Sequence, residues 1–159
     1  MDLFEEYLGK KETSEWVKRA LTDTSYRNVD HGLTEKKTNA DLATYGDAVI
    51  KLGYSELLLD KVKDLSDEKA NYESDEYLVK TVAKHYDMLK HIRIDPNDKK
   101  IPTNYDYKKS KKTSSGKHKK HNPYKYIATA VEAMIGAIYK ETNDLKPIIE
   151  LLNSWRDFK

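Results

Sequence analysis

The chain has 159 residues and a formal net charge of +2; 35% of its residues are charged and 38% are hydrophobic. This length is enough for one domain with its own core, and the clustering of apolar residues argues against a disordered chain. The absence of cysteine excludes a disulfide framework and any thiolate nucleophile or metal ligand.

No segment has the features of a targeting or membrane sequence. Residues 1–6 are acidic and lack the basic and apolar parts of a secretory signal. No apolar run approaches the length needed to span a bilayer. We therefore expect a cytoplasmic protein with no membrane partner.

Apolar residues recur at helical spacing along most of the chain. Ser14 and Ser74 are suitable N-cap residues, and Pro147 lies near the start of a last helix. No run of alternating apolar and polar residues is long enough to predict a strand. The fold class is therefore all-α, with helices expected over 14–21, 40–54, 57–65, 75–85, 127–139 and 147–155.

A turn at residues 95–98 is followed by a stretch with no periodicity, and we expect a long loop over about 99–124. A loop of this length in a compact helical domain usually serves a function.

The basic residues are concentrated in this loop. Residues 107–125 contain eight lysines and no acid, which leaves a net charge of −6 on the rest of the chain. Such a concentration is typical of a phosphate-binding element, although a solvated loop, a localisation signal or a site for another polyanion remain alternatives. His118 and His121 are extra donors rather than zinc ligands, since no partner set is present. The candidate RNA-binding lysines are Lys108, Lys109, Lys111, Lys112, Lys117, Lys119, Lys120 and Lys125.

Asp47 is the first candidate catalytic residue. It lies inside a predicted helix, between Gly46 and Ala48, where a neighbouring helix can approach closely. Aspartate is a poor residue for a helix interior because it competes for backbone hydrogen bonds. Asp47 is therefore either functional or an ordinary solvent-facing acid.

Glu132 is the second candidate. Ala128, Glu132 and Gly136 share one helical stripe, with Thr129 almost on the same side. Small residues on both sides of an acid allow close helix packing. The alternative is an acid paired with a lysine.

Two carboxylates with a basic loop suggest metal-dependent cleavage of a nucleic acid. Mg²⁺ prefers hard oxygen ligands, keeps several waters, and both generates a nucleophile and neutralises charge at a phosphodiester. A pair of carboxylates alone is not a specific signal, since many folds bring two acids together.

Several segments, in order, resemble the ribonuclease III family. Residues 20–26 are similar to its Ala-Leu-Thr-His-x-Ser-Tyr segment. Residues 39–49 resemble the first signature, which ends in Gly-Asp-Ala-Val, and residues 128–139 resemble the second, Glu-Ala-x-Ile-Gly-Ala-Ile-Tyr. The resemblance covers about residues 15–155. It implies the helical bundle of the ribonuclease III endonuclease domain, as a single domain over 1–159 without a double-stranded-RNA-binding domain.

The chain departs from the longer enzymes at three acidic positions, where it has Ala40, Ala43 and Thr129. Ala and Thr at the latter two are similar to the Mini-III subfamily, as is Tyr124-Lys125-Tyr126 before the second signature.

The resemblance implies a homodimeric, Mg²⁺-dependent endoribonuclease, with Mn²⁺ as a plausible substitute. It would cleave double-stranded RNA to 5′-phosphate and 3′-hydroxyl ends, in the processing of RNA such as ribosomal RNA. Asp47 and Glu132 would be the catalytic metal ligands, and Thr129 would order a water where longer enzymes use a carboxylate.

Two other readings compete with this one. A catalytically silent relative that binds structured RNA, for instance in a ribosome, fits the loss of the site acids at Ala43 and Thr129. A helical interaction domain with a basic loop and no RNA role leaves the ordered matches unexplained.

Overall fold

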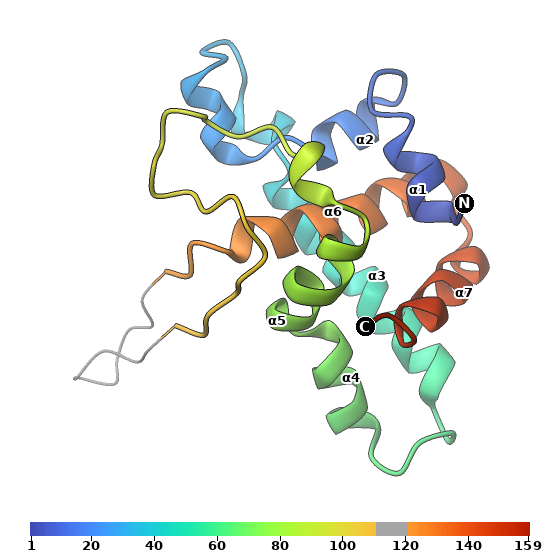
Figure 1. Ribbon diagram of the computed structural model, residues 1–159. Coiled ribbons are helices and arrows are strands. Elements are labelled where there is room, and N and C mark those ends of the chain that lie inside the picture. Colours follow the sequence, from blue (N-terminus) through green and yellow to red (C-terminus); the bar gives the residue numbers. More distant parts are fainter. Residues whose placement is uncertain (111–120) are drawn as a thin grey trace.

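The computed structural model describes residues 1–110 and 121–159 as an assembly of helices around one core (Figure 1). Within these residues the only β-type pairing is an isolated bridge between Thr22 and Arg93, so the all-α prediction is confirmed. The elements are α1 (Leu3–Leu8), α2 (Glu15–Ala20), η1 (Thr24–Asn28), η2 (Glu35–Lys37), α3 (Ala40–Leu58), α4 (Leu65–Glu73), α5 (Asp75–Tyr77), η3 (Leu78–Ala83), η4 (Met88–Lys90), α6 (Lys125–Thr142) and α7 (Leu145–Trp155).

The helix α6 is the centre of the domain. Nearly all of its residues from Ile127 to Ile138 are buried, and it packs most extensively against α3, with α2, η3, α1 and α7 around it. Figure 1 shows α6 running through the middle of the molecule, with α1 and α2 on one side and α4 and α5 on the other. No helix among the described residues is long and apolar enough to cross a membrane.

The closest contact in the core is the crossing of α3 and α6. A Cβ atom added to Gly46 would lie 1.7 Å from the carbonyl oxygen of Glu132, and one added to Gly136 would lie 2.8 Å from that of Leu42. Both are closer than any side chain allows. The two backbones therefore touch directly, as the small residues in the two signatures predict.

The predicted N-caps are confirmed. The Ser14 hydroxyl accepts from the Val17 amide, and the Ser74 hydroxyl accepts from the Tyr77 amide. These bonds satisfy amide groups that lack a partner in the first turn of a helix.

One predicted helix is wrong, and two helices, α1 and α4, were missed. Residues 57–65 form no helix of their own: α3 continues to Leu58, and Asp60 takes a left-handed conformation at φ 63°. The next helix begins only after Asp64, whose side chain accepts from the Asp67 amide. The short α1 was not predicted; it buries Phe4, which stacks on Tyr86 with ring centroids 4.3 Å apart.

The helix crossing gives a direct test. Replacing Gly46 with Ala should lower the free energy of unfolding by about 3 kcal/mol or more, because the added methyl group forces α3 and α6 apart. Urea denaturation would measure the change. A Gly32→Ala variant is the control, because its Cβ would meet only the Asp30 side chain, at 3.6 Å. Equal stability of the two variants would contradict direct contact at the crossing.

Candidate active site

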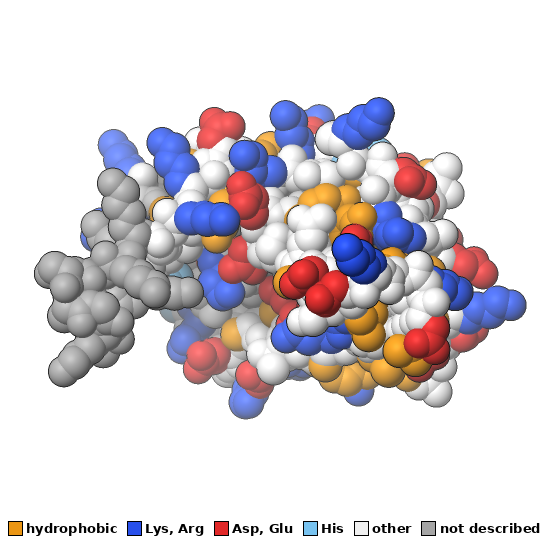
Figure 2. Space-filling view, turned by 90° about the horizontal axis from the view of Figure 1, so that it is seen from below, with side chains coloured by type: hydrophobic (Ala, Val, Ile, Leu, Met, Phe, Trp, Pro, Cys, Tyr) orange, Lys and Arg blue, Asp and Glu red, His pale blue; other side chains and the backbone are white. Residues whose placement is uncertain are grey.

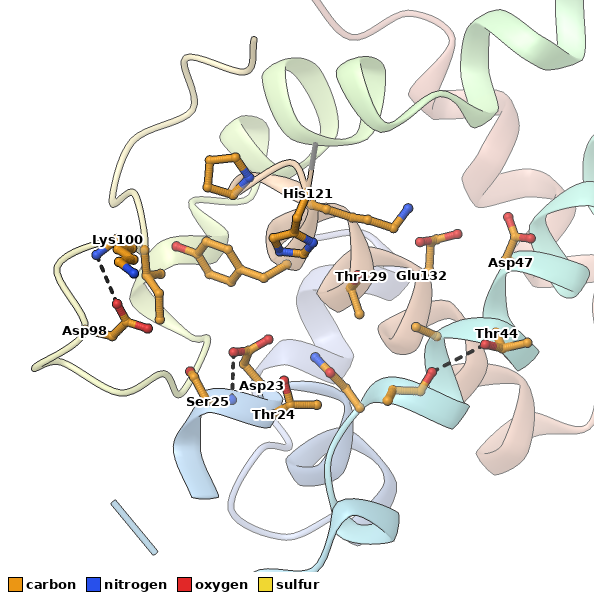
Figure 3. Close-up of a pocket in the computed structure, with 17 residues that line it drawn as sticks. Asp23, Thr24, Ser25, Thr44, Asp47, Asp98, Lys100, His121, Thr129 and Glu132 are labelled. Atoms are coloured by element: carbon orange, nitrogen blue, oxygen red, sulfur yellow. Dashed lines mark hydrogen bonds between the residues drawn. The ribbon is translucent and has the colours of Figure 1, made fainter. Parts of the chain in front are cut away.

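A pocket of about 700 Å³ lies where α3, the start of α6, η1 and two loop segments meet (Figure 3). Its walls come from parts of the chain that are distant in sequence, and several of its side chains are charged or carry hydroxyl groups. The residues that line it are Asp23, Thr24, Ser25, Asn39, Ala40, Ala43, Thr44, Asp47, Asp98, Lys100, Ile101, His121, Pro123, Lys125, Tyr126, Thr129 and Glu132.

The two candidate acids lie side by side at one end of this pocket, Asp47 on α3 and Glu132 on α6 (Figure 3). Their proximity follows from the helix crossing, because Gly46 precedes Asp47 and touches the backbone of Glu132. No side chain separates the two helices at this point. The structure therefore brings together the two carboxylates singled out in the sequence.

Burial and the neighbouring acids disfavour the charged form of Glu132. Burial raises the pKa of Glu132 to about 8, and the Asp47 carboxylate adds to this shift, followed by the charge of Asp75. The positive charge of Lys125 acts in the opposite direction. A cation bound at the two carboxylates would favour the charged form of Glu132.

Lys51 is a site residue that sequence reasoning missed. It lies one turn after Asp47 on α3, and its Nζ atom is 2.7 Å from Oδ2 of Asp47. The hydrogen bond and charge of Asp47 raise the pKa of Lys51, and the charges of Glu73 and Glu132 act in the same direction. The i, i+4 spacing of Asp47 and Lys51 was a signal that could have identified this pair.

Asp75 is a second residue that was missed as part of the site. Its Oδ2 atom is 3.1 Å from Nζ of Lys125, the first residue of α6. The sequence identified Asp75 only as a favourable acid at a helix start, because its partner lies 50 positions further along the chain. The pair links α5 to the rim of the pocket.

The positions without the family's acids also line the pocket. Ala43 lies on α3, one turn before Asp47, and Thr129 lies on α6, one turn before Glu132. Across residues 1–110 and 121–159, no group of three or more Asp, Glu, His or Cys side chains is arranged to hold a metal ion. In the described structure, the acidic end of the pocket is therefore a pair of carboxylates.

Three of the eight candidate lysines are described by the structure. Lys125 lines the pocket, whereas Lys108 and Lys109 lie outside its lining. Lys109 is 82% exposed, with Nζ 3.9 Å from Glu76. The others, with His118, lie outside the described residues: Lys111, Lys112, Lys117, Lys119 and Lys120.

The two arms of the basic loop meet beside the pocket. The Asn122 side-chain amide donates to the Lys108 carbonyl at 2.7 Å, and the Tyr107 and Tyr124 rings pack edge to face with centroids 6.2 Å apart. These contacts hold the base of the loop at the start of α6. On the face seen in Figure 2, Lys and Arg side chains are interspersed with Asp and Glu rather than gathered in one patch.

This donor set fits a hard divalent cation. Asp47 and Glu132 offer carboxylate oxygens from two helices, and a bound cation would offset the burial and the Asp47 charge that raise the pKa of Glu132. Mg²⁺ is commonly held in proteins by one or two carboxylates together with waters and substrate phosphates. The pair therefore suits an ion that is shared with a phosphate-containing substrate.

The raised pKa predicts a pH-dependent stability. Glu132 ionises near its model value of 4.5 in the unfolded chain and near 8 in the folded, metal-free protein, so stability falls as pH rises between these values. A Glu132→Gln variant lacks this fall. Its free energy of unfolding should exceed that of wild type increasingly up to about pH 8, by up to about 1.4 kcal/mol per pH unit.

Chemical denaturation in EDTA across this pH range would measure the difference. Glu150→Gln, on the exposed part of α7, controls for the loss of one carboxylate. Parallel pH profiles of wild type and Glu132→Gln would contradict the raised pKa.

Comparison with solved structures identifies the fold. The nuclease domain of ribonuclease III from Campylobacter jejuni, in a structure that describes flexibility in its dimer-forming region, aligns with a TM-score of 0.62 and 21% identity. The alignment covers 96% of this chain and 90% of that one. A second structure of the same nuclease domain gives a TM-score of 0.61 and 20% identity, over 96% and 88% of the two chains.

No curated protein matches the sequence. The profile of the Ribonuclease III domain, however, matches residues 40–143, which include both acids of the pocket and both helices of the crossing. This span is well over half of the chain. The chain therefore belongs to the ribonuclease III family, and it is an endoribonuclease of that family.

Proposed function

We propose that this domain cleaves double-stranded RNA in a reaction that requires Mg²⁺, leaving 5′-phosphate and 3′-hydroxyl ends. The observation that carries the proposal is the pair of carboxylates from α3 and α6 at one end of a pocket of about 700 Å³. The family match supports duplex RNA as the substrate class.

In this proposal Asp47 and Glu132 hold the metal ion. When bound, the ion would supply Lewis-acid activation and charge neutralisation at the scissile phosphate. Asp47 also forms an ion pair with Lys51, and Lys125, which is paired with Asp75, places a positive charge at the rim that can attract a phosphate. Thr129 contributes a hydroxyl that can orient a water in the pocket.

The basic loop would contact phosphates rather than bases. Its lysines give affinity without sequence information, because the deep major groove of A-form RNA hides the base edges. Selectivity would then depend on duplex shape and 2′-hydroxyl contacts.

We further propose a homodimer that is similar to the Mini-III subfamily and acts in the maturation of structured RNA such as ribosomal RNA. Ala43 and Thr129 at the positions of the missing acids support the subfamily. The dimer-forming region named for the Campylobacter jejuni nuclease domain supports the dimer.

The first test is cleavage of a perfect RNA duplex of a few tens of base pairs. Wild type should cut the duplex with Mg²⁺, and should leave it intact in EDTA. Glu132→Gln and Asp47→Asn should each lower the cleavage rate at least roughly a hundredfold while retaining duplex affinity. Each replaces a negatively charged carboxylate ligand of the metal ion with a neutral amide. A single-stranded RNA of the same sequence is the substrate control, and cleavage by Glu132→Gln at the wild-type rate would refute the site.

A second prediction concerns Lys51. Because its ammonium group pairs with Asp47, it competes with a metal ion for that carboxylate. A Lys51→Met variant should bind Mn²⁺ about threefold to tenfold more tightly without RNA, which corresponds to roughly 1 kcal/mol of repulsion removed. Isothermal titration calorimetry would measure the affinity.

Lys10→Met is the matched control, since Lys10 forms an i, i+4 pair with Glu6 at 3.6 Å on α1, outside the pocket lining. If the affinities of wild type and Lys51→Met are the same, Lys51 does not compete for the site.

A further inference from the structure

A second pocket, of about 370 Å³, lies beside the first on the α2 side of the domain. We call it the arginine pocket. It is formed by α2, the segment from η1 to η2, and the chain after η4, with four cations, two acids and two apolar residues in its walls. These residues are Glu15, Trp16, Lys18, Arg19, Asp30, Leu33, Lys37 and Arg93.

Two short segments of chain separate the arginine pocket from the first pocket, which we call the catalytic pocket because Asp47 and Glu132 line it. The Arg93 amide donates to the Leu21 carbonyl at 2.7 Å, and the Arg93 carbonyl accepts from the amide of Asp23, which lines the catalytic pocket. On the other side, the Arg19 Nε atom donates to the carbonyl of Thr38 at 3.2 Å, and the next residue, Asn39, again lines the catalytic pocket. The two pockets are therefore neighbours that share these segments of chain.

The two arginines are held by uncharged groups. Arg93 donates to the Thr22 hydroxyl, and its guanidinium carbon lies 4.8 Å from the Tyr26 ring centroid. Arg19 binds the Thr38 carbonyl and packs against Trp16, 5.6 Å from its ring centroid. These contacts orient the guanidinium groups without neutralising their charge.

The four cations of the pocket are not paired with acids. Among the described residues, none of Lys18, Arg19, Lys37 and Arg93 has a carboxylate oxygen within 4.0 Å. Of the two acids in the wall, Asp30 already accepts from the Gly32 amide at 3.1 Å. The pocket thus combines a formal charge of +2 with oriented donors, which is the chemistry of an anion site.

We propose that the arginine pocket binds a backbone phosphate of the same RNA duplex whose scissile phosphate occupies the catalytic pocket. This inference rests on the proposed function. A guanidinium group presents parallel N–H donors that match the geometry of phosphate oxygens, and ordering by Trp16 and Tyr26 reduces the entropy lost on binding. Proteins grip duplex RNA mainly through such phosphate and 2′-hydroxyl contacts. The pocket would set where the duplex lies relative to the two carboxylates.

The test measures duplex binding by fluorescence anisotropy over a range of salt concentrations. EDTA is present so that metal-dependent cleavage does not interfere. A Lys18→Gln, Lys37→Gln double variant should bind roughly tenfold more weakly, and its salt slope should fall by up to about 0.9 per lost phosphate contact. The charge-matched control is Lys61→Gln, Lys63→Gln, in the loop between α3 and α4, at the far end of the molecule (Figure 1). It should bind with nearly wild-type affinity.

Arg19→Lys tests the guanidinium group itself, because it keeps the charge but loses the forked donors. It should weaken duplex binding at least about threefold, with unchanged thermal stability as the check on folding. If the double variant and Arg19→Lys both bind as wild type does, the pocket is not an RNA contact. If wild type itself binds no duplex, the proposed function fails as well.

A second experiment distinguishes binding of RNA phosphate in the pocket from binding of free inorganic phosphate. The indole N–H signal of Trp16 in an NMR spectrum reports on the pocket, whereas Trp155 is buried in the core. Duplex should shift the Trp16 signal in wild type and not in the double variant, and inorganic phosphate should shift it only at millimolar concentration. Micromolar binding of inorganic phosphate, with duplex affinity unaffected by the substitutions, would overturn the proposal in favour of a small-anion site.

Discussion

The contact between the backbones of α3 and α6 is the constraint on which the rest of the structure depends. At Gly46 and Gly136 neither helix has a side chain, so the helices approach until main-chain atoms touch. Any Cβ at Gly46 would overlap the carbonyl group of Glu132. The same contact places the next residue of α3, Asp47, beside Glu132, so close helix packing and carboxylate pairing have one structural cause.

Placing two acids together has an electrostatic cost, and the surrounding lysines offset part of it. Lys51 pairs with Asp47, and Lys125 pairs with Asp75 while lowering the pKa of Glu132. Opposite charges thus alternate around the acidic end of the pocket. Burial and the charge of Asp47 still raise the pKa of Glu132, and a bound cation would favour its charged form.

The local features of the fold could be predicted from the sequence, and the long-range ones could not. Serine caps identified the starts of α2 and α5, and apolar periodicity identified α3 and α6, because these signals act within one or two turns. The prediction of a helix over 57–65 was wrong because consecutive leucines have no helical periodicity. A pattern of apolar residues also gives no sign of the left-handed conformation of Asp60. The two acids were found because small residues flank them, whereas Asp75 and the arginine pocket depend on tertiary contacts between distant segments.

The hydrogen bond from the Asn122 side chain to the Lys108 carbonyl closes the basic loop at its base, next to the first turn of α6. The two ends of the loop are thereby fixed next to each other. The entropy of closing such a loop changes slowly with its length, by about 0.6 kcal/mol for each doubling. The hydrogen bond therefore costs little to form whatever the length of the chain that it closes, and the helix crossing and the carboxylate pair, which are built from α3 and α6, do not depend on it.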